Sequence, residues 1–596
     1  MNRHSSLMTV LGTVGVATSC SSTGAATDSG FVQSCNAIQS LDLGAGTTIA
    51  LAKAFRKGDP LSIGPANGKP LAPADLCFVK VVVGPGNPGA ADAPSTSMGI
   101  GIEIWLPTPE NWNERYQALG GGGWQGGPGY TSLTEIGSLS PVTDNDPPTW
   151  AKEGFVTSAT DTGHSVTDGS FAMNPDGSLN ETLLVDFGDR AVHEMALATK
   201  ALMIAFYGRS AKHSYFAGCS QGGRQGLAEV QRHPDDFDGV LSGAPAVDMD
   251  ILGIADLWPQ IAMQQDLGGP MARTKLLAVT AAANAACGTA LTGRADGYIS
   301  DPSMCAYDPT RDAAVLCVPD GGANATPSCL TKVEASAANK IWYGPTVDGT
   351  VPPPSVDNGF APVGVLASKQ LWFGLSRGTA IAGQPIWGGL GEHGPFSTAA
   401  DVLALALGDP AFAEPGFVNA SGSGSSLWRT VGYAGPTSIP VAFSTSQQRL
   451  GELLATASPD ITAFRDRGGK LVIWHGTADT LLFPQASIHY YESVVARLGG
   501  YAAAQTVARF YLGPGLDHCA ALVPGTNPPV PDGEGSPKPA LVNALVAWVE
   551  TGEPPDQLAA VSAPGVTPVR RRPWCLYPKR LKYVSGDPDT GEFTCE

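Results

Sequence analysis

The chain has 596 residues, of which 43% are hydrophobic and only 15% are charged, so it can bury a large core. This composition excludes an intrinsically disordered protein. The formal net charge of −18 argues against nucleic acids and anionic membrane surfaces as partners.

The N-terminal segment has the pattern of an export signal. Arg3 precedes an apolar run from Leu7 to Ala17, which is too short to span a bilayer and has the length of a signal-peptide core. The run ends in VATSC, so Cys20 is a candidate acylated residue of a lipoprotein, and ordinary cleavage nearby is the alternative. We therefore expect residues 1–20 to be a signal. The protein is then secreted, or it is a periplasmic or outer-membrane lipoprotein that contacts the membrane only through this anchor.

The following segment alternates between predicted strands and helices. Ile100, Ile102, Ile104 and Leu106 share one face, as in a half-buried strand, whereas residues 21–75 are expected to be rich in loops. Further strands are predicted in RYQALGGGGWQGGPG, where the strand runs into a glycine loop, in GFVTSATDTGH, which ends in polar residues, in KHSYFAG and in FDGVLSGAP. Helices are predicted in DRAVHEMALATKALMIAFYG and RQGLAEVQRHP. This alternation predicts an α/β fold with a mainly parallel sheet and helices on both faces.

A long insertion interrupts the sheet pattern. Residues 247–458 are rich in Gly, Pro, Ala and Ser. The strand pattern returns in GGKLVIWHGTAD, and ARFYLGPGLDHC is predicted to be the next strand and loop, before a helix in ALVNALVAWVETG. A segment of this length is more typical of a lid than of a loop. We therefore predict an α/β core formed by residues 21–246 and 459–596, with a lid domain formed by residues 247–458.

Ser220 is the candidate nucleophile. The segment GCSQG, residues 218–222, matches G-x-S-x-G between a predicted strand and a predicted helix, and this sharp turn lifts a serine hydroxyl clear of a sheet. A serine needs a histidine base and an acid that orients the base. Asp479 and His518 follow in that chain order, each just past a predicted strand, where open parallel sheets form their active sites. The alternative is a structural serine in a glycine-rich turn.

Two backbone N–H groups are expected to stabilise the tetrahedral intermediate. One belongs to Gln221, the residue after the candidate serine. The other is expected in the glycine loop GGGGW, residues 120–124, where we predict Gly123. The alternative is that these glycines only form a turn.

The chain contains 11 cysteines, and ten remain if Cys20 is lipidated or removed. An even number in an exported protein predicts disulfides, and the lack of close C-x-x-C pairs argues against zinc. Cys219 precedes the candidate serine and Cys519 follows the candidate histidine. These two cysteines are predicted to bond if the serine and the histidine meet.

Four segments of the sequence match a known family. They are SYFAGCSQGGRQGLAEVQRHPDDFDGVLSGAPA, AFRDRGGKLVIWHGTAD, GPGLDHC and LVAWVETGEPPDQL. With the cysteines beside the serine and the histidine, they resemble the tannase and feruloyl esterase family of α/β-hydrolases. The resemblance implies hydrolysis of aromatic carboxylic esters beneath a large lid, with Ser220, Asp479 and His518 as the triad and Gly123 and Gln221 as oxyanion donors. It also implies the disulfides Cys35–Cys77, Cys219–Cys519, Cys287–Cys305, Cys317–Cys329 and Cys575–Cys595.

The resemblance further implies a calcium site in the lid, built from an aspartate-rich loop between two cysteines. The matching stretch is CGTALTGRADGYISDPSMC, whose candidate ligands are Asp296, Asp301 and the backbone carbonyl of Tyr298. Calcium prefers six to eight oxygen ligands, and the early aspartates of the family pattern are missing here. The two alternatives are a weakened calcium site and a disulfide-tied loop without metal. The chemistry itself requires no cofactor.

The expected substrate is a small aromatic ester with a feruloyl, other hydroxycinnamoyl or galloyl group. Tryptophan rings can stack on such groups, and an arginine can pair with a substrate carboxylate, although a structural or exposed arginine is the alternative. The candidate substrate-binding residues are Trp124, Leu482, Phe483, Trp387 and Arg429.

Two positions depart from the family's bacterial hydrolase of mono(2-hydroxyethyl) terephthalate. Leu482 stands where that enzyme carries an aromatic pocket residue, with Phe483 one position away, and Gly122 replaces a serine. The predicted function is a secreted serine carboxylesterase that forms an acyl-enzyme, and a terephthalate-monoester hydrolase is the alternative. A surface lipoprotein that binds a ligand without catalysis is the alternative from another class.

Overall fold

The secondary structure is taken from a computed structural model, which describes residues 23–90, 92–139, 146–360, 367–383, 394–520, 526–533, 536–565 and 567–596. The helices are α1 (Thr23–Ala37), α2 (Pro147–Lys152), α3 (Glu181–Val185), α4 (Ala191–Tyr207), α5 (Gln221–Arg232), α6 (Met249–Asp256), α7 (Trp258–Leu267), α8 (Arg273–Cys287), α9 (Lys332–Tyr343), α10 (Ser397–Leu407), α11 (Ile439–Leu454), α12 (Thr462–Asp466), α13 (Pro484–Leu498), α14 (Tyr501–Ala504) and α15 (Lys538–Thr551). The strands are β1 (Thr47–Phe55), β2 (Leu76–Val83), β3 (Ile100–Pro107), β4 (Arg115–Leu119), β5 (Val156–Thr160), β6 (His213–Cys219), β7 (Gly239–Gly243), β8 (Val418–Asn419), β9 (Gly422–Ser423), β10 (Lys470–Gly476), β11 (Ala508–Gly513), β12 (Val530–Pro531), β13 (Gln557–Leu558), β14 (Ala560–Val561), β15 (Trp574–Cys575), β16 (Leu581–Ser585) and β17 (Glu592–Cys595).

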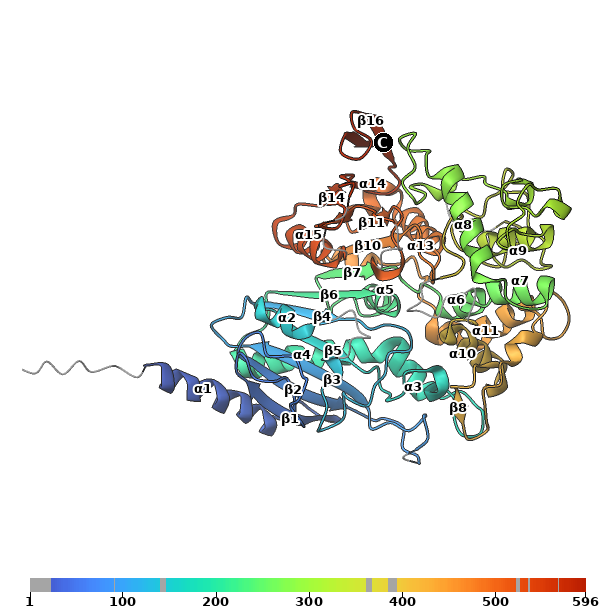
Figure 1. Cartoon of the computed structure of the whole chain (residues 1–596). Helices are drawn as coiled ribbons and strands as arrows, with labels where there is room; N and C mark the ends of the chain where they lie inside the picture. Colours follow the sequence, from blue (N-terminus) through green and yellow to red (C-terminus); the bar gives the residue numbers. More distant parts are fainter. Residues whose placement is uncertain are drawn as a thin grey trace, which may run out of the picture.

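One nine-stranded sheet organises the molecule, with strand order β1-β2-β3-β5-β4-β6-β7-β10-β11 (Figure 1). The strands from β5 to β11 in this order pair in parallel, whereas β1, β2, β3 and β5 pair antiparallel. The predicted α/β class and mainly parallel sheet are therefore confirmed. The parallel part brings the carboxyl ends of β6, β10 and β11 to the same edge of the sheet.

Helices cover both faces of this sheet because successive strand residues point in opposite directions. On β10, Ile473 packs in a core shared with α4, α5 and α13, whereas Val472 and Trp474 pack in a separate core shared with α15. The helix predicted around residues 189–208 corresponds to α4, which buries Val192, Met195, Thr199 and Leu202 and ends at Gly208, which has φ +73°. The central strands are thus buried on both sides.

Two predictions about the N-terminal part of the chain are wrong. Residues 21–75 were expected to be rich in loops, but they contain α1 and β1, and β1 pairs antiparallel with β2. The edge strand β1 is mostly half-buried, so its sequence TTIALAKAF has little contrast between its two faces. Strand β3 was expected to be half-buried, yet all eight of its residues are buried, because it lies inside the sheet between two covered faces.

The insertion separates two groups of sheet strands. Strands β1 to β7 precede residue 247, and β10 and β11 follow residue 458. Between them the chain forms α6 to α11, which gather beside one end of the sheet (Figure 1), and α6 packs against α10 and α11. No helix among the described residues is both long enough and apolar enough to cross a bilayer.

Among the described residues, five disulfides are present: Cys35–Cys77, Cys219–Cys519, Cys287–Cys305, Cys317–Cys329 and Cys575–Cys595. These are the pairs that the family resemblance implies. Such bonds fit an oxidising compartment outside the cytosol. The predicted export signal and Cys20 lie outside the described residues.

Candidate active site

The candidate nucleophile occupies a sharp turn between β6 and α5. Ser220 has φ +64° and ψ −123°, a left-handed conformation that is strained for a residue with a side chain. Its N–H donates to Gly243 O over 2.9 Å, and its carbonyl accepts from the N–H groups of Arg224 and Ala246. These bonds to β7, to α5 and to the loop after β7 hold the strained backbone in place. This is the strand–turn–helix geometry that the G-x-S-x-G pattern predicts.

Glycines allow the start of α5 to pack against backbone on two sides. A Cβ atom on Gly218 would lie 2.6 Å from the backbone of Gly222, and one on Gly222 would lie 2.8 Å from Gly121 O. Gly222 N–H donates to Gly121 O over 2.7 Å. Larger residues at these positions would push the turn away from the glycine loop that follows β4.

The same contact brings together the two segments that carry the predicted oxyanion donors. Gln221 opens α5, so its N–H has no acceptor within the helix. Gly123 has φ +54°, and a Cβ atom there would meet no atom within 4 Å, so this residue faces open space. Both donors stay predictions, and the Gly222–Gly121 hydrogen bond links the segments that carry them.

The candidate base and acid are in direct contact. His518 opens the short helix η10 (His518–Ala520) after β11, and Asp479 lies in the loop after β10. His518 Nδ1 lies 2.8 Å from Asp479 Oδ2, and both side chains are buried. The other oxygen, Asp479 Oδ1, accepts from the N–H groups of Leu481 and Leu482 over 2.9 and 2.8 Å. The loop backbone thus fixes the carboxylate that orients the imidazole.

A second histidine, which its place before the acid in the chain favours as a residue that holds its own loop together rather than as the base, contacts the same carboxylate. His475 Nε2 lies 3.1 Å from Asp479 Oδ2, and His475 Nδ1 lies 2.8 Å from Ser487 Oγ. Burial by itself raises the pKa of Asp479, but the imidazoles of His518 and His475 outweigh burial and hold that pKa below its ordinary value. Asp479 is therefore ionised at neutral pH. The sequence signal for His475 is its position four residues before the acid, at the end of a predicted strand.

A disulfide connects the candidate nucleophile to the candidate base. Cys219 and Cys519 are bonded, with 5.8 Å between their Cα atoms, across a sequence separation of 300 residues. Cys219 directly precedes Ser220, and Cys519 directly follows His518. The bond therefore holds the β6–α5 turn and the η10 turn side by side, although they lie far apart in the chain.

Trp124, one of the predicted substrate-binding residues, is buried next to the glycine loop. Its indole Nε1 donates to Asp401 Oδ2 of α10 over 3.0 Å, and its ring packs against Phe171 and Phe187. Its carbonyl lies 2.8 Å from the Nε2 atom of His164. Trp124 thus links the glycine loop to the insertion.

The other predicted substrate-binding residues lie in different surroundings. Leu482 and Phe483 are buried in the core formed largely by the insertion, and the N–H of Leu482 binds Asp479 as described above. Arg429 is exposed, and its guanidinium lies 5.3 Å from the ring centroid of Trp428. Trp387 lies outside the described residues. Leu482 is therefore in contact with a candidate catalytic residue, whereas Arg429 stacks on its neighbour.

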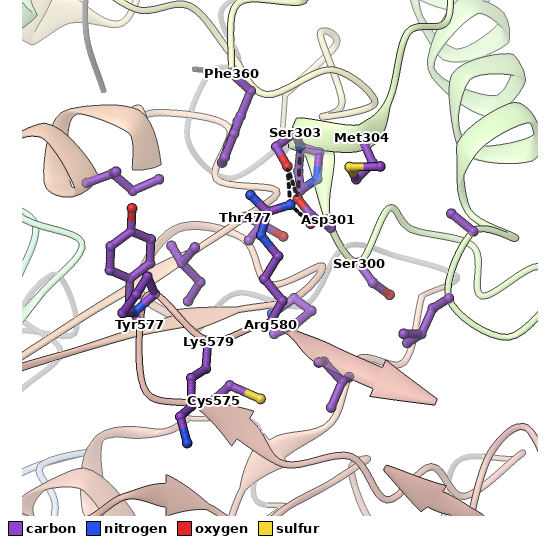
Figure 2. Close-up of a pocket in the computed structure, with 18 of the residues that line it drawn as sticks. Ser300, Asp301, Ser303, Met304, Phe360, Thr477, Cys575, Tyr577, Lys579 and Arg580 are labelled. Carbon is purple, nitrogen blue, oxygen red and sulfur yellow. Dashed lines mark hydrogen bonds and ion pairs between the residues drawn. The ribbon is translucent and has the colours of Figure 1, made fainter. Parts of the chain in front are cut away.

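The two aspartates among the predicted metal ligands bind arginines. Asp296 forms a two-pronged ion pair with Arg572, Tyr298 contacts the same guanidinium through its hydroxyl, and Asp301 pairs with Arg580. Arg580 and Asp301 also line a cavity of about 450 Å³, shown in Figure 2. Neither Ser220 nor His518 lines this cavity.

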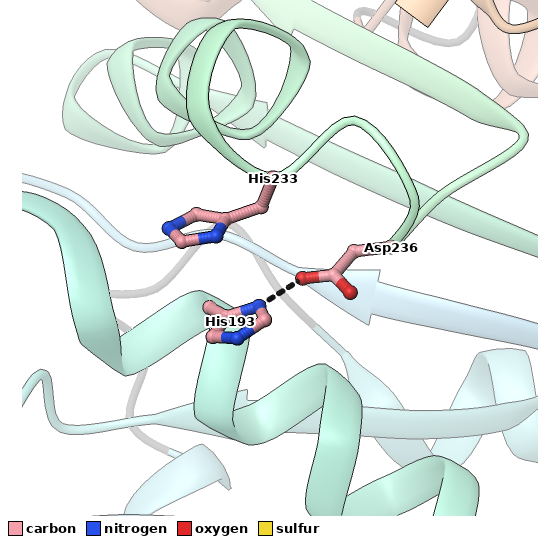
Figure 3. A group of neighbouring side chains, drawn as sticks. All are labelled: His193, His233 and Asp236. Atoms are coloured by element: carbon pink, nitrogen blue, oxygen red, sulfur yellow. Dashed lines mark hydrogen bonds and ion pairs between the residues drawn. The ribbon is translucent and has the colours of Figure 1, made fainter.

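A separate histidine cluster connects α4 to the end of α5. His193, His233 and Asp236 each place a potential ligand atom within 4.8 Å of the others (Figure 3). The two imidazole rings stack 4.1 Å apart, and each ring already contacts a carboxylate: His193 binds Asp236 over 2.6 Å, and His233 binds Asp189 over 3.0 Å. Lone pairs of imidazoles lie in the ring plane, so stacked rings do not converge on one ion. The contacts of the two imidazoles with Asp236 and Asp189 explain why these side chains lie so close together.

Comparison with known proteins identifies the family. The model of the family "Tannase and feruloyl esterase" matches residues 81–380 and 420–595. A probable feruloyl esterase of Arthroderma benhamiae is 32% identical over 546 residues, which cover 89% of this chain and 87% of that protein. The mono(2-hydroxyethyl) terephthalate hydrolase of Piscinibacter sakaiensis is 30% identical over 538 residues, which cover 83% of this chain and 81% of that protein.

Solved structures agree with this result at the level of the fold. The crystal structure of feruloyl esterase B from Aspergillus oryzae aligns with a TM-score of 0.72 and 24% identity, over 95% of this chain and 100% of that one. The tannin acyl hydrolase from Aspergillus niger aligns with a TM-score of 0.68 and 20% identity, over 95% and 94% of the two chains. Because the family model spans most of the sequence and the relatives match it nearly end to end, this chain belongs to the tannase and feruloyl esterase family of carboxylic ester hydrolases.

Proposed function

We propose that the protein hydrolyses aromatic carboxylic esters with Ser220 as nucleophile, His518 as general base and Asp479 as the acid that orients the base. One arrangement supports this assignment above all. The Asp479–His518 contact of 2.8 Å is joined to the strained Ser220 turn by the Cys219–Cys519 disulfide. This arrangement, in the chain order of α/β-hydrolases, supports a triad formed by three residues that are distant in sequence.

The proposed reaction has two stages. Ser220 Oγ attacks the ester carbonyl while His518 Nε2 takes its proton, and the ionised Asp479 stabilises the imidazolium through Nδ1. The N–H groups of Gly123 and Gln221 stabilise the negative oxygen of the tetrahedral intermediate. The intermediate then collapses, His518 returns the proton to the departing alcohol, and the acyl group stays on Ser220. A water molecule, activated by His518, releases the acid and restores the serine.

The proposed acyl group is feruloyl, another hydroxycinnamoyl group or galloyl. Support comes from the family model and from the probable feruloyl esterase at 32% identity. Terephthalate monoesters are the second candidate, because the relative at 30% identity is named as a hydrolase of mono(2-hydroxyethyl) terephthalate. Calcium takes no part in either proposed reaction.

We further propose that the protein is exported. The five disulfides support export from the cytosol, since such bonds persist in oxidising compartments. Cys20 is the proposed lipidation site if the mature protein is a lipoprotein. Mass spectrometry of the mature N-terminus distinguishes a diacylglyceryl-modified Cys20 from a plain cleaved end.

The test of the catalytic proposal is Ser220→Ala, compared with Ser210→Ala, which replaces an exposed serine. We expect Ser220→Ala to lower kcat at least ~10³-fold on methyl ferulate, methyl gallate and mono(2-hydroxyethyl) terephthalate. The Ser220→Ala protein should also lose covalent labelling by a fluorophosphonate. The Ser210→Ala protein should keep both the ester turnover and the labelling of the wild type. Undiminished turnover by the Ser220→Ala protein would refute the assignment. The relative kcat/KM values of the wild type on the three esters decide between the acyl groups.

A further inference from the structure

The disulfide-closed loop of the insertion, Cys287–Cys305, is held to the C-terminal segment by arginines. Asp296 is fully buried, and both of its oxygens are bound by Arg572: Nη1 lies 2.6 Å from Oδ2, and Nη2 lies 2.9 Å from Oδ1. Arg572 is 3% exposed and also donates to Pro588 O and Tyr298 Oη. A buried carboxylate paired this way has its charge and its lone pairs satisfied by one guanidinium.

More charged groups surround this pair. Arg570 Nε lies 3.8 Å from Asp296 Oδ1 and 3.1 Å from Asp589 Oδ1, and Arg294 also pairs with Asp589. The cluster therefore sets three guanidinium groups against two carboxylates, which leaves one excess positive charge. Burial by itself lowers the pKa of Arg572, but Asp296 and Tyr298 outweigh burial and raise it, so this guanidinium stays charged.

The second candidate carboxylate of the loop, Asp301, is also engaged. Asp301 Oδ2 accepts from Arg580 Nη1 over 2.9 Å, and Asp301 Oδ1 accepts from the N–H and hydroxyl of Ser303 (Figure 2). At the start of the loop, Gly288 and Leu291 offer no carboxylates. Calcium requires six to eight oxygen ligands and a negative surrounding charge. The residues present do not fit this ion.

We propose that the guanidinium of Arg572 takes the place of calcium in this loop, so that a metal-free arginine clamp joins the insertion to the C-terminal segment. The arginine clamp comprises Asp296, Arg570, Arg572 and Asp589. Asp296 comes from the insertion, and the other three come from residues 570–589. An ion pair between the two segments holds them together as a bridging cation would, and it needs no free metal. This inference does not depend on the identity of the ester substrate.

The first measurement uses the intact, disulfide-bonded wild-type protein. We expect less than about 0.1 calcium per chain by elemental analysis after gel filtration in calcium-free buffer. Neither excess EDTA nor about 5 mM calcium chloride should move the thermal midpoint by more than ~1 °C, since stabilisation by mass action requires a ligand that binds the folded state. One tightly held calcium per chain, or a midpoint that EDTA lowers and calcium restores, would overturn the proposal.

The second measurement compares Arg572→Gln with Arg571→Gln, its exposed neighbour. Arg572→Gln leaves Asp296 buried without its main partner, so we expect its thermal midpoint to fall by at least ~3 °C, whereas Arg571→Gln should stay within ~1 °C. Equal midpoints for the two variants would contradict the clamp. If Arg572→Gln does not fold, Arg572→Lys keeps the charge but not the two-pronged geometry, so its thermal midpoint should lie below those of the wild type and of Arg571→Gln. A midpoint of Arg572→Lys equal to that of the wild type would then contradict the clamp.

Discussion

At the scale of single residues, the site depends on backbone geometry as much as on reactive side chains. Ser220 adopts φ +64°, and Gly218 and Gly222 let backbone approach backbone beneath it. Strain of this kind persists only where the surroundings over-determine the conformation. Here the bonds of Ser220 to Gly243, Arg224 and Ala246 provide that restraint.

The first prediction concerns Gly218→Ala. The added methyl group would lie 2.6 Å from the backbone of Gly222, so α5 must shift away and carry the N–H of Gln221 with it. We expect kcat to fall by roughly 10²–10³, the loss typical of a misplaced oxyanion donor, together with a lower thermal midpoint. Gly269→Ala is the control, because a methyl group there meets no atom within 4 Å. Wild-type turnover rates for both variants would contradict the expected displacement of α5 by the methyl group at position 218.

At the scale of elements, turns far apart in the chain are aligned by covalent and hydrogen bonds. The β6–α5 turn contacts the glycine loop through Gly222 and Gly121, and it is bonded to η10 through Cys219 and Cys519. The loop after β10 contributes Asp479. These four segments at one sheet edge thus form a single unit, although 300 residues separate Cys219 from Cys519 alone.

The second prediction tests this coupling with the double variant Cys219→Ala/Cys519→Ala. Removing a cross-link that closes so long a loop should lower the free energy of unfolding by about 2–4 kcal/mol. It should also lower kcat, because the serine and histidine turns lose their fixed distance. The control, Cys317→Ala/Cys329→Ala, opens a separation of only 12 residues within the insertion. That control should lose less stability and keep its kcat; equal losses of kcat in the two double variants would count against the coupling.

At the scale of the whole molecule, the insertion and the core share buried carboxyl groups. Asp401 of α10 accepts hydrogen bonds at Oδ2 from Trp124 Nε1 over 3.0 Å and from Gly169 N–H over 2.9 Å, and both donors belong to the core. Burial, with a contribution from Asp168 and Glu414, raises the pKa of Asp401 from 3.8 to about 7. Burial likewise raises the pKa of Asp250 in α6 to about 7.

The third prediction follows from these pKa values. Between about pH 4 and pH 7 the folded protein keeps protons on Asp401 and Asp250 that the unfolded chain has released, so the free energy of unfolding falls as pH rises through this window. The net charge of −18 at pH 7 also lowers the free energy of unfolding as pH rises, because like charges repel one another in the folded protein. We expect a lower thermal midpoint at pH 8 than at pH 5.

Asp401→Asn provides the matched variant for this prediction. Asparagine keeps an acceptor oxygen for Trp124 and Gly169 but does not ionise, so the variant should be more stable than the wild type at pH 8 and similar to it at pH 5. Differential scanning calorimetry at both pH values measures the difference. A wild-type midpoint that rises from pH 5 to pH 8 is incompatible with the assigned direction.

The sequence was sufficient to predict those elements and site residues that a local pattern of residues encodes. A continuous apolar run predicted β10, helical periodicity predicted α4 and α15, and the glycine spacing around Ser220 predicted the turn. The order of Ser220, Asp479 and His518 along predicted strands was enough to propose a triad, because parallel strands end at one edge of a sheet. The cysteines beside Ser220 and His518 were sufficient to predict a bond between them. In contrast, β1 was not predicted, because an edge strand with small, half-buried side chains shows little alternation between apolar and polar residues.

Only the tertiary structure decided which distant charges meet. No local pattern links Asp296 to Arg572, 276 residues further along the chain, and the loop sequence alone left a calcium site and a metal-free loop equally open. Likewise, Asp401 reaches Trp124 only because packing brings separate segments together. Propensity and spacing act over a few residues, whereas the partner of a buried charge is chosen by the global fold, because desolvation makes an unpaired charge too costly to bury.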